Sequence, residues 1–220
     1  MIHLENVSKI YQTRYGTVKA LNDVTFEVEA GEFVVVRGVS GCGKTTLLMT
    51  ISGMQRPNSG NVIVGGNSLY TMSIRGRALF RAQGIGFVFQ MFHLVPYLNV
   101  IENVLLAGGA VGETDTEAKA NRLLERLGLT DRTFHRPSEL SAGEKQRTAI
   151  ARALLNRPKI ILADEPAGNL DPDNAAVVLG HLADFRCQGG TVIVVTHGTD
   201  ADRFADRTIY MHDGRIDNFS

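Results

Sequence analysis

The segment Gly38 to Thr45, GVSGCGKT, has the G-x-x-x-x-G-K-T spacing of a phosphate-binding loop. Small residues allow backbone N–H groups to close around phosphate oxygens, Lys44 supplies a fixed positive charge, and the Thr45 hydroxyl suits Mg²⁺. A glycine-rich structural turn is the alternative. The apolar strand pattern before the loop, EFVVVR, and the apolar helix start after it, KTTLLMTIS, favour a nucleoside triphosphate site.

Three further sets of polar residues follow apolar strand patterns. They are Gln90 after IGFVF, the pair Asp164-Glu165 after KIILA, and His197 after TVIVVT. In an open parallel sheet, ligands bind beyond the carboxyl ends of the strands. We therefore expect these side chains to share one site with the phosphate loop, although they lie far apart in the sequence.

Each of these residues has an expected role and an alternative. Asp164 is placed like the carboxylate that holds Mg²⁺ in phosphate-loop ATPases, here through a water. Glu165 points elsewhere and is a candidate general base for the attacking water. A helix cap or a surface turn is the alternative for such an acidic pair. The Gln90 amide is a candidate for contact with Mg²⁺ or the water, and His197 for contact with the γ-phosphate, while packing or surface roles are the alternatives.

The segment Leu140 to Arg147, LSAGEKQR, opens a helix. Ser141 and Glu144 have the spacing of a capping box, in which each side chain accepts a hydrogen bond from the other's backbone N–H. The same helix start is a candidate anion site, with Ser141 and Gly143 presented to a phosphate. The residues alone leave both interpretations open.

Apolar periodicity predicts the elements that position these groups. Alternation predicts antiparallel strands at 3–7 and 18–28 and, after a turn at 58–61, a short strand at 62–64. Apolar runs predict buried strands at 32–37, 85–89, 159–163 and 191–196. Helical spacing predicts helices at 116–127, 141–156 and 174–185. These elements predict an α/β fold with a parallel-sheet core, an N-terminal antiparallel β layer and an inserted α-helical subdomain.

We expect one domain over 1–220, in which residues 1–90 and 157–220 form the core with its β layer and residues 91–156 form the helical lobe. The contents of 44% hydrophobic and 21% charged residues are typical of a folded soluble protein. The formal net charge of +0 gives no electrostatic signal for nucleic acid or anionic lipid.

The sequence predicts a cytoplasmic protein. No apolar run is long enough to span a bilayer, and the N-terminus lacks a signal-peptide pattern, so any membrane role must come through a partner. The two cysteines, Cys42 and Cys187, are too few for a disulfide framework and indicate a reducing compartment. Cys42 lies inside the phosphate loop, where a small filler residue is favoured over a reactive thiol.

Taken in order, the motifs resemble those of ABC-type ATPases over essentially the whole chain. The segment that begins Leu140-Ser141 distinguishes this family from other phosphate-loop ATPases. The resemblance implies a RecA-like phosphate-loop core, ATP and Mg²⁺ as ligands, Mg-dependent ATP hydrolysis, and an ATP-dependent homodimer that encloses two nucleotides head to tail. The motifs are Gly38–Thr45, Gln90, Leu140–Arg147, Ile160–Pro166, Asn169–Asp171 and His197.

The resemblance also implies roles for single residues. Ser141 and Gly143 would contact the γ-phosphate held by the partner, and Asp171 would belong to the loop that joins the two sites. Tyr11 falls where the family has an aromatic residue that stacks on adenine, although an ordinary strand-edge aromatic is the alternative. The expected catalytic residues are Lys44, Gln90, Glu165 and His197, and the expected Mg²⁺ residues are Thr45, Gln90 and Asp164. The expected nucleotide-binding residues are Tyr11, Gly38, Val39, Ser40, Gly41, Cys42, Gly43, Lys44, Thr45, Thr46, Ser141, Gly143 and Asp171.

A narrower resemblance, to the lipoprotein-releasing and macrolide-export group, is carried by IGFVFQ at 85–90, LVP at 94–96, ENV at 102–104 and HRPSELS at 135–141. It implies a chain at the inner face of the cell membrane that powers an integral membrane transporter subunit on a separate chain. Mechanical signalling, in which the same ATPase drives a membrane protein that transports nothing, fits the residues as well. A soluble ATPase of DNA repair or translation is disfavoured, because neither a coiled-coil insertion nor a second ATPase domain is visible.

Three residues depart from the family pattern: Ala142 replaces a glycine, Ala167 replaces Thr or Ser, and Gly198 replaces Asp. None of these changes removes a catalytic group. Ala142 is compatible with phosphate binding to the partner if its φ is negative, because no left-handed residue is then required. The segment Met91 to Leu98, MFHLVPYL, carries large apolar residues directly after Gln90. Buried core and a docking groove for a membrane subunit's cytoplasmic helix are both open for it.

Overall fold

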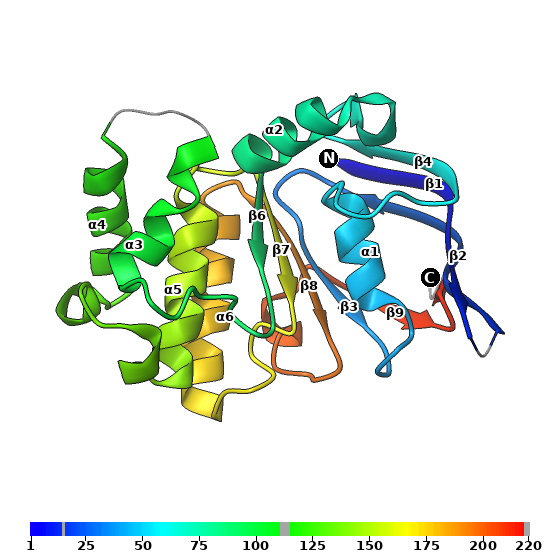
Figure 1. The fold of residues 1–220 in the computed structure, drawn as a ribbon. Helices are drawn as coiled ribbons and strands as arrows, with labels where there is room; N and C mark the ends of the chain where they lie inside the picture. The colour runs from blue at the N-terminus through cyan, green and yellow to red at the C-terminus, as the bar shows by residue number, and fades with distance from the viewer. Residues whose placement is uncertain (15, 111–114, 218–220) are drawn as a thin grey trace.

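The structure, a computed structural model, describes residues 1–14, 16–110 and 115–217, and it contains two sheets and a set of helices (Figure 1). The strands are β1 (Ile2–Thr13), β2 (Gly16–Val28), β3 (Phe33–Arg37), β4 (Ser59–Val64), β5 (Asn67–Ser68), β6 (Ile85–Val88), β7 (Ile160–Asp164), β8 (Thr191–Thr196), β9 (Arg207–His212) and β10 (Arg215–Asp217). The α-helices are α1 (Lys44–Ile51), α2 (Ile74–Gly84), α3 (Val100–Leu105), α4 (Thr116–Arg126), α5 (Ala142–Leu154) and α6 (Pro172–Cys187). Short 3-10 helices are η1 (Leu69–Thr71), η2 (Gly108–Ala110), η3 (Thr130–Arg132), η4 (Pro137–Glu139) and η5 (Asp202–Phe204).

The larger sheet has the strand order β10-β9-β3-β8-β7-β6. All neighbouring pairs from β9 to β6 are parallel, and only the edge strand β10 is antiparallel. Strands β7 and β8 are almost wholly buried, which explains their continuous apolar runs, because parallel strands are covered on both faces. The prediction of a parallel core is confirmed, and the carboxyl ends of β3, β8, β7 and β6 lie along one edge.

The smaller sheet is antiparallel, with the order β2-β1-β4-β5, and it confirms the predicted β layer. Strands β1 and β2 are longer than the predicted ones, because β-bulges after Leu4, Val7 and Lys9 interrupt the alternation from which a strand is read. The predicted turn at 58–61 is wrong in part. Ser59 pairs with Ser8 and Asn61 pairs with Glu5, so β4 begins inside it.

The two faces of the larger sheet support two hydrophobic clusters. Val34 and Val36 point into the cluster that α1 and the smaller sheet complete, and Phe33 and Val35 point into the cluster formed with α3, α4, α5 and α6. Figure 1 accordingly shows α1 between the two sheets and α5 and α6 across the larger sheet from it. This alternation is the period of two along β3.

Three predicted helices correspond to α4, α5 and α6, with ends shifted by a few residues. The spacing of apolar residues did not predict α2 or α3. Helix α2 has no buried residue, so it lacks the apolar stripe from which a helix is inferred, and α3 is only a turn and a half long. Among the described residues, no helix is both long enough and apolar enough to cross a membrane.

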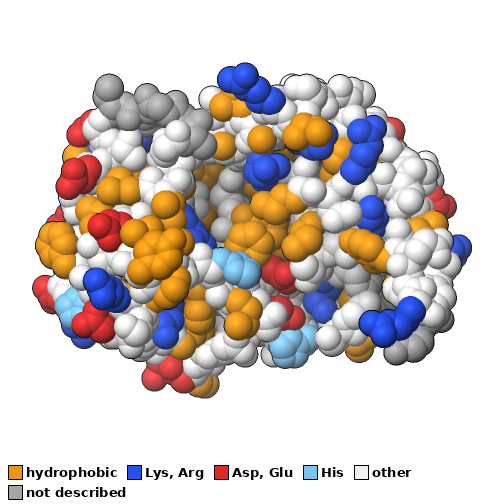
Figure 2. Space-filling view, in the orientation of Figure 1, with side chains coloured by type: hydrophobic (Ala, Val, Ile, Leu, Met, Phe, Trp, Pro, Cys, Tyr) orange, Lys and Arg blue, Asp and Glu red, His pale blue; other side chains and the backbone are white. Residues whose placement is uncertain are grey.

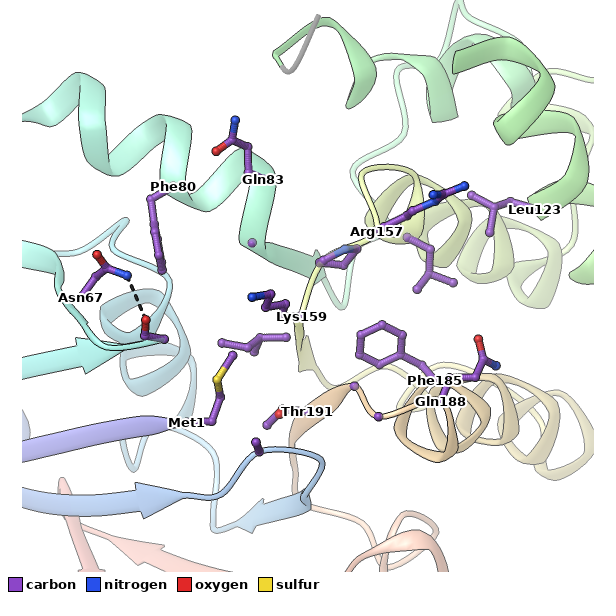
Figure 3. A pocket seen from close by; sticks show the side chains of 18 of the residues that line it. Met1, Asn67, Phe80, Gln83, Leu123, Arg157, Lys159, Phe185, Gln188 and Thr191 are labelled. Atoms are coloured by element: carbon purple, nitrogen blue, oxygen red, sulfur yellow. Dashed lines mark hydrogen bonds between the residues drawn. The ribbon is translucent and has the colours of Figure 1, made fainter. Parts of the chain in front are cut away.

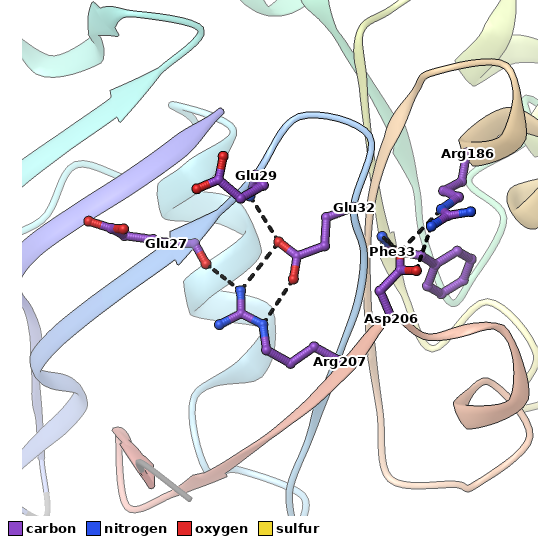
Figure 4. A network of polar contacts seen from close by, with 7 residues as sticks. All are labelled: Glu27, Glu29, Glu32, Phe33, Arg186, Asp206 and Arg207. Carbon is purple, nitrogen blue, oxygen red and sulfur yellow. Dashed lines mark hydrogen bonds and ion pairs between the residues drawn. The ribbon is translucent and has the colours of Figure 1, made fainter. Parts of the chain in front are cut away.

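A polar network joins the sheet layers near β9 (Figure 4). Arg207 donates to the Glu32 carboxylate at 2.9 Å and to the Glu27 carbonyl at 2.7 Å, and so connects β9 with the turn between β2 and β3. Asp206 accepts from the Phe33 backbone N–H at 2.8 Å and from Arg186 of α6. These bonds fix the start of β3 relative to β2, β9 and α6.

Candidate active site

The segment Gly38 to Thr45 connects β3 to α1, as a phosphate loop requires. Gly43 has φ of 110°, and an added Cβ would lie 2.0 Å from the Ala20 carbonyl oxygen, so no other residue fits there. No side chain caps the start of α1. Its first N–H groups, at the positive end of the helix, are therefore available to an anion.

Lys44 is a buried cation, only 7% exposed. Its Nζ donates to the carbonyl oxygens of Gly38 at 2.7 Å and Val39 at 3.0 Å, both in its own loop. These carbonyl oxygens accept hydrogen bonds from the Lys44 ammonium group but do not neutralise its positive charge. A buried positive charge that faces uncapped N–H groups makes this loop complementary to phosphate oxygens.

Asp164 is the last residue of β7, and its side chain is buried. Burial raises the pKa of its carboxyl, and the neighbouring Glu165 acts in the same direction, while the hydrogen bond from Thr45 and the charge of Lys44 oppose the rise. The link between Thr45 and Asp164 brings together a hydroxyl and a carboxylate at the phosphate loop. Oxygen donors of this kind suit Mg²⁺.

Glu165 turns away from Asp164 because its backbone adopts φ of 46°, in the left-handed region that a non-glycine residue rarely occupies. Its N–H donates to the Val195 carbonyl of β8 at 2.9 Å. One carboxylate oxygen accepts from the Thr196 hydroxyl at 2.9 Å, and the other lies 2.8 Å from His197 Nδ1. The carboxylate is thereby held in one direction.

The cap and surface-turn alternatives for the acidic pair are wrong. Asp164 and Glu165 are both buried, and the next helix, α6, is capped by Asp171 instead. A buried pair of acids at the end of a parallel strand, beside a buried lysine, is typical of a catalytic site.

His197 and Gln90 occupy the same edge of the sheet. His197 follows β8 directly, and 65% of its side chain is exposed although Nδ1 contacts Glu165. Gln90 lies two residues beyond β6, the neighbour of β7. Its side chain is exposed and has no hydrogen-bond partner within the described part of the chain, so its contact with Mg²⁺ or water stays a prediction.

The start of α5 confirms the capping box. Ser141 Oγ accepts from the Glu144 N–H at 3.2 Å, and the Glu144 carboxylate accepts from the Ser141 N–H at 2.8 Å. Ala142 is the first helical residue and is not among the residues with positive φ, which meets the condition for a phosphate contact. Arg132 donates to Glu144 at 2.8 Å and lowers the pKa of that carboxyl to about 2.

Helices α5 and α1 lie on opposite sides of the larger sheet, so Ser141 and Gly143 are not grouped with the phosphate loop of the same chain (Figure 1). Ser141 is exposed. Asp171, the cap of α6, accepts from the Asn174 N–H at 3.0 Å and is exposed as well. Ser141 and Asp171 therefore lie on an exposed part of the chain away from its own phosphate loop, whereas Gly143 is buried.

Two further predictions for the nucleotide site concern the Tyr11 ring and the Cys42 thiol. Tyr11 lies on β1 opposite Val18, half-buried, with Lys9 Nζ 5.3 Å from its ring centroid. Its stacking on adenine stays a prediction. Cys42 is 4% exposed and belongs to the hydrophobic cluster around α1, which supports the filler interpretation.

The segment 91–98 lies on the surface, and its buried-core interpretation is wrong because none of its residues is buried. Phe92 and His93 have φ of 57° and 48°, and their carbonyls accept from Arg152 of α5 at 2.7 and 2.6 Å. Asn103, fully buried, accepts from the Val95 N–H at 2.7 Å and donates to three carbonyls. An apolar segment is therefore held at the surface by polar bonds beneath it.

A cavity away from this edge of the sheet lies at the opposite ends of the strands (Figure 3). It has a volume of about 1080 Å³ and is lined by residues such as Lys159, Phe185 and Thr191 at the amino ends of β7 and β8. A smaller cavity of about 140 Å³ adjoins Thr196 and His197. Residue chemistry, and not cavity size, therefore locates the candidate site.

Sequence patterns missed two polar residues of this region. Thr196 holds Glu165, and its only signal was a hydroxyl at the end of an apolar run. Asn174 contacts Asp171 and had no signal apart from its position three residues later, which is the N3 position of a capped helix.

The parallel sheet, the phosphate loop and the buried acidic pair define a phosphate-loop nucleotide hydrolase. Comparison with known proteins narrows this class. The profile of the ABC transporter family matches residues 21–168. The lipoprotein-releasing system ATP-binding protein LolD of Bacteroides thetaiotaomicron is 41% identical over 219 residues, with 98% of this chain and 99% of LolD covered. The macrolide export ATP-binding/permease protein MacB of Chlorobaculum tepidum is 43% identical over 217 residues, which are 98% of this chain and 33% of MacB.

Among solved structures, the ATP-binding cassette MJ0796, in a dimeric post-hydrolysis state bound to ADP and Pi, matches with a TM-score of 0.93 at 36% identity. The match covers 99% of this chain and 97% of that one. The chain therefore belongs to the ABC transporter family. It is an ATP-binding and ATP-hydrolysing subunit of this type.

Proposed function

We propose that the chain powers an integral membrane transporter subunit of the lipoprotein-releasing or macrolide-export type, carried on a separate chain. The Glu165 carboxylate supports a hydrolytic role most directly, since it is buried and held by Thr196 and His197 next to Asp164. The similarity to LolD over nearly the full length of both chains favours this type of transporter.

In this proposal the loop 38–45 and Thr46 bind the phosphates of ATP, and Tyr11 stacks on the adenine. Thr45, Asp164 through a water, and Gln90 would hold Mg²⁺, which suits their oxygen donors. The ion would supply positive charge that offsets the negative charge of the phosphates. Lys44 adds a positive charge that burial keeps unscreened.

Glu165 orients the attacking water and accepts its proton. Thr196 and His197 hold the carboxylate in one direction at the edge of the sheet, which suits it to orient a water. The exposed ring of His197 is free to contact the γ-phosphate. Hydrolysis depends mainly on this positioning, since phosphoryl transfer requires little covalent chemistry from the protein.

A second copy of the chain completes each site. Ser141 and Asp171 are exposed, away from the phosphate loop of their own chain, and Gly143 lies buried two residues after Ser141. In this proposal the three residues contact the nucleotide of the partner instead. ATP then favours the closed dimer and hydrolysis releases it, which is ligand-biased switching between two states. The lobe 91–156 and the core residues 1–90 and 157–220 are the units that move.

The surface segment 91–98 docks the membrane subunit. Met91 and Tyr97 are 68% and 74% exposed, and hydrophobic side chains gather on the face between the helices and the larger sheet (Figure 2). The segment follows Gln90, so a change at the phosphates reaches the docking surface along the backbone. In this proposal the chain therefore works at the inner face of the cell membrane, bound to the membrane subunit.

The test is the variant Glu165→Gln. We expect ATP hydrolysis to fall at least about 100-fold, as for loss of a general base, while the variant forms a dimer in ATP during size-exclusion chromatography. Glu125→Gln, an exposed change on α4, is the matched control and should hydrolyse ATP like the wild type. Hydrolysis by Glu165→Gln at the rate of the control would contradict the proposed role.

A further inference from the structure

The starts of α5 and α6 contact each other at Gly143. An added Cβ on Gly143 would lie 2.3 Å from Asn174 Oδ1 and 2.7 Å from Asn174 Cγ. The Asn174 amide therefore fills the space that a side chain at position 143 would occupy. A Cβ on Gly143 would therefore displace the Asn174 side chain, and the backbone angle of Gly143 does not itself call for glycine.

The same amide reaches the cap of α6. Asn174 Nδ2 donates to Asp171 Oδ2 at 2.7 Å, and the Asn174 backbone N–H donates to Asp171 Oδ1 at 3.0 Å. Arg147, on α5, donates to Asn174 Oδ1 at 3.4 Å. The two bonds from Asn174 to Asp171, the backbone one first, lower the pKa of the Asp171 carboxyl. One short side chain thus contacts α5 through its oxygen and Asp171 through its nitrogen.

We propose that Asn174 is a positioning residue that holds the signature turn, Ser141–Gly143, and Asp171 as one rigid unit. Only an amide suits this position, because it must accept on the side of Arg147 and donate on the side of Asp171. The inference rests on the proposed function, in which both parts of the unit enter the partner's nucleotide site. A shift of one part then displaces the other, so Asn174 acts on a nucleotide that it does not touch.

The experiment measures dimerisation in the Glu165→Gln background. Analytical ultracentrifugation gives the ATP concentration at which half of the protein is dimeric, for Glu165→Gln alone and for Glu165→Gln combined with Asn174→Ala or Asn174→Asp. We expect Asn174→Ala to raise this ATP concentration about tenfold, because a hydrogen bond to a charged group is lost. Asn174→Asp should raise it at least as far, since a second carboxylate then faces Asp171.

Two measurements separate positioning from simple loss of stability. The affinity of the monomer for a fluorescent ATP analogue should stay within about twofold, because the phosphate loop lies across the sheet from Asn174. Val177→Ala, at a 45% exposed position of α6, is the matched control and should leave dimerisation unchanged. If Asn174 only stabilised the fold, Asn174→Ala would lower the unfolding temperature and leave the ATP dependence of dimerisation unchanged.

A double-mutant cycle identifies the route. Gly143→Ala should displace the Asn174 amide, so Gly143→Ala combined with Asn174→Ala should be no worse than the more severe single variant. If the Glu165→Gln protein dimerises at the same ATP concentration whether or not it also carries Asn174→Ala, this inference alone is overturned. If Glu165→Gln does not dimerise in ATP at all, the proposed function fails and the inference fails with it.

Discussion

Removal of the Thr196 hydroxyl should slow hydrolysis while leaving ATP binding intact. Thr196 Oγ1 donates to Glu165 Oε2 at 2.9 Å and accepts from the Gly198 N–H at 3.0 Å. Thr196→Val keeps the shape of the side chain and removes both bonds. Glu165 then retains only His197, whose ring is mostly exposed and so constrains the carboxylate weakly.

The size of the effect follows from the kind of bond. A hydrogen bond to a charged group contributes about 1.5–3 kcal/mol. If about 1.5 kcal/mol of it is expressed in the transition state, kcat falls roughly tenfold. The phosphate loop is untouched, so KM for ATP should stay within about twofold, and the split between kcat and KM identifies a group that positions the base.

The assay is steady-state release of phosphate from Mg·ATP by purified protein. Thr191→Val is the matched control, because Thr191 starts the same strand and accepts from the Gly31 N–H at 2.9 Å. That variant should lose about 1 kcal/mol of unfolding free energy and keep its kcat. A folded Thr196→Val protein with kcat within twofold of the wild type would refute the role given to the hydroxyl.

Two further predictions concern stability, measured by urea unfolding. Asn103→Ala should lower the unfolding free energy by about 3 kcal/mol, since it leaves the Val95 N–H and three carbonyls without the buried Asn103 amide as their partner. The cap variant Asn99→Ala should lower it by only about 1 kcal/mol, and equal losses would contradict this prediction. Arg132 holds the pKa of Glu144 near 2, below its usual 4.5, so the pair stabilises the fold above about pH 4.5 and the contribution is lost as the pH falls towards 2. The unfolding free energy that Glu144→Gln removes should therefore be constant from pH 5 to 7 and shrink on acidification, and a difference that persists at low pH would rule the ion pair out as its source.

The parallel core could be predicted from the sequence because burial on both faces leaves a local trace. Strands β3, β7 and β8 read as unbroken apolar runs, and each was placed within a residue or two. Helix α2 left no such trace, since none of its residues is buried. The bulges of β1 likewise depend on its partners, so the extra length of that strand was not visible in its own alternation.

The candidate site divides in the same way. The glycines, Lys44 and Thr45 of the phosphate loop lie within one short segment, and their spacing alone indicates phosphate binding. The bonds from Thr196 and His197 to Glu165 join β8 to the residue after β7, and no pattern along the chain predicts which oxygen each contacts. The contact of Asn174 with Gly143 joins two helices in the same manner.

By itself, the sequence determined the phosphate loop, the polar residues that follow the buried strands and the capping box at Ser141. Each of these features depends on residues within one turn or one strand. The tertiary structure decided the direction of the Glu165 carboxylate and the exposure of residues 91–98. These features depend on atoms that are distant in the chain. An apolar segment such as 91–98 can be buried or exposed with the same residues, and the buried Asn103 beneath it selects the surface.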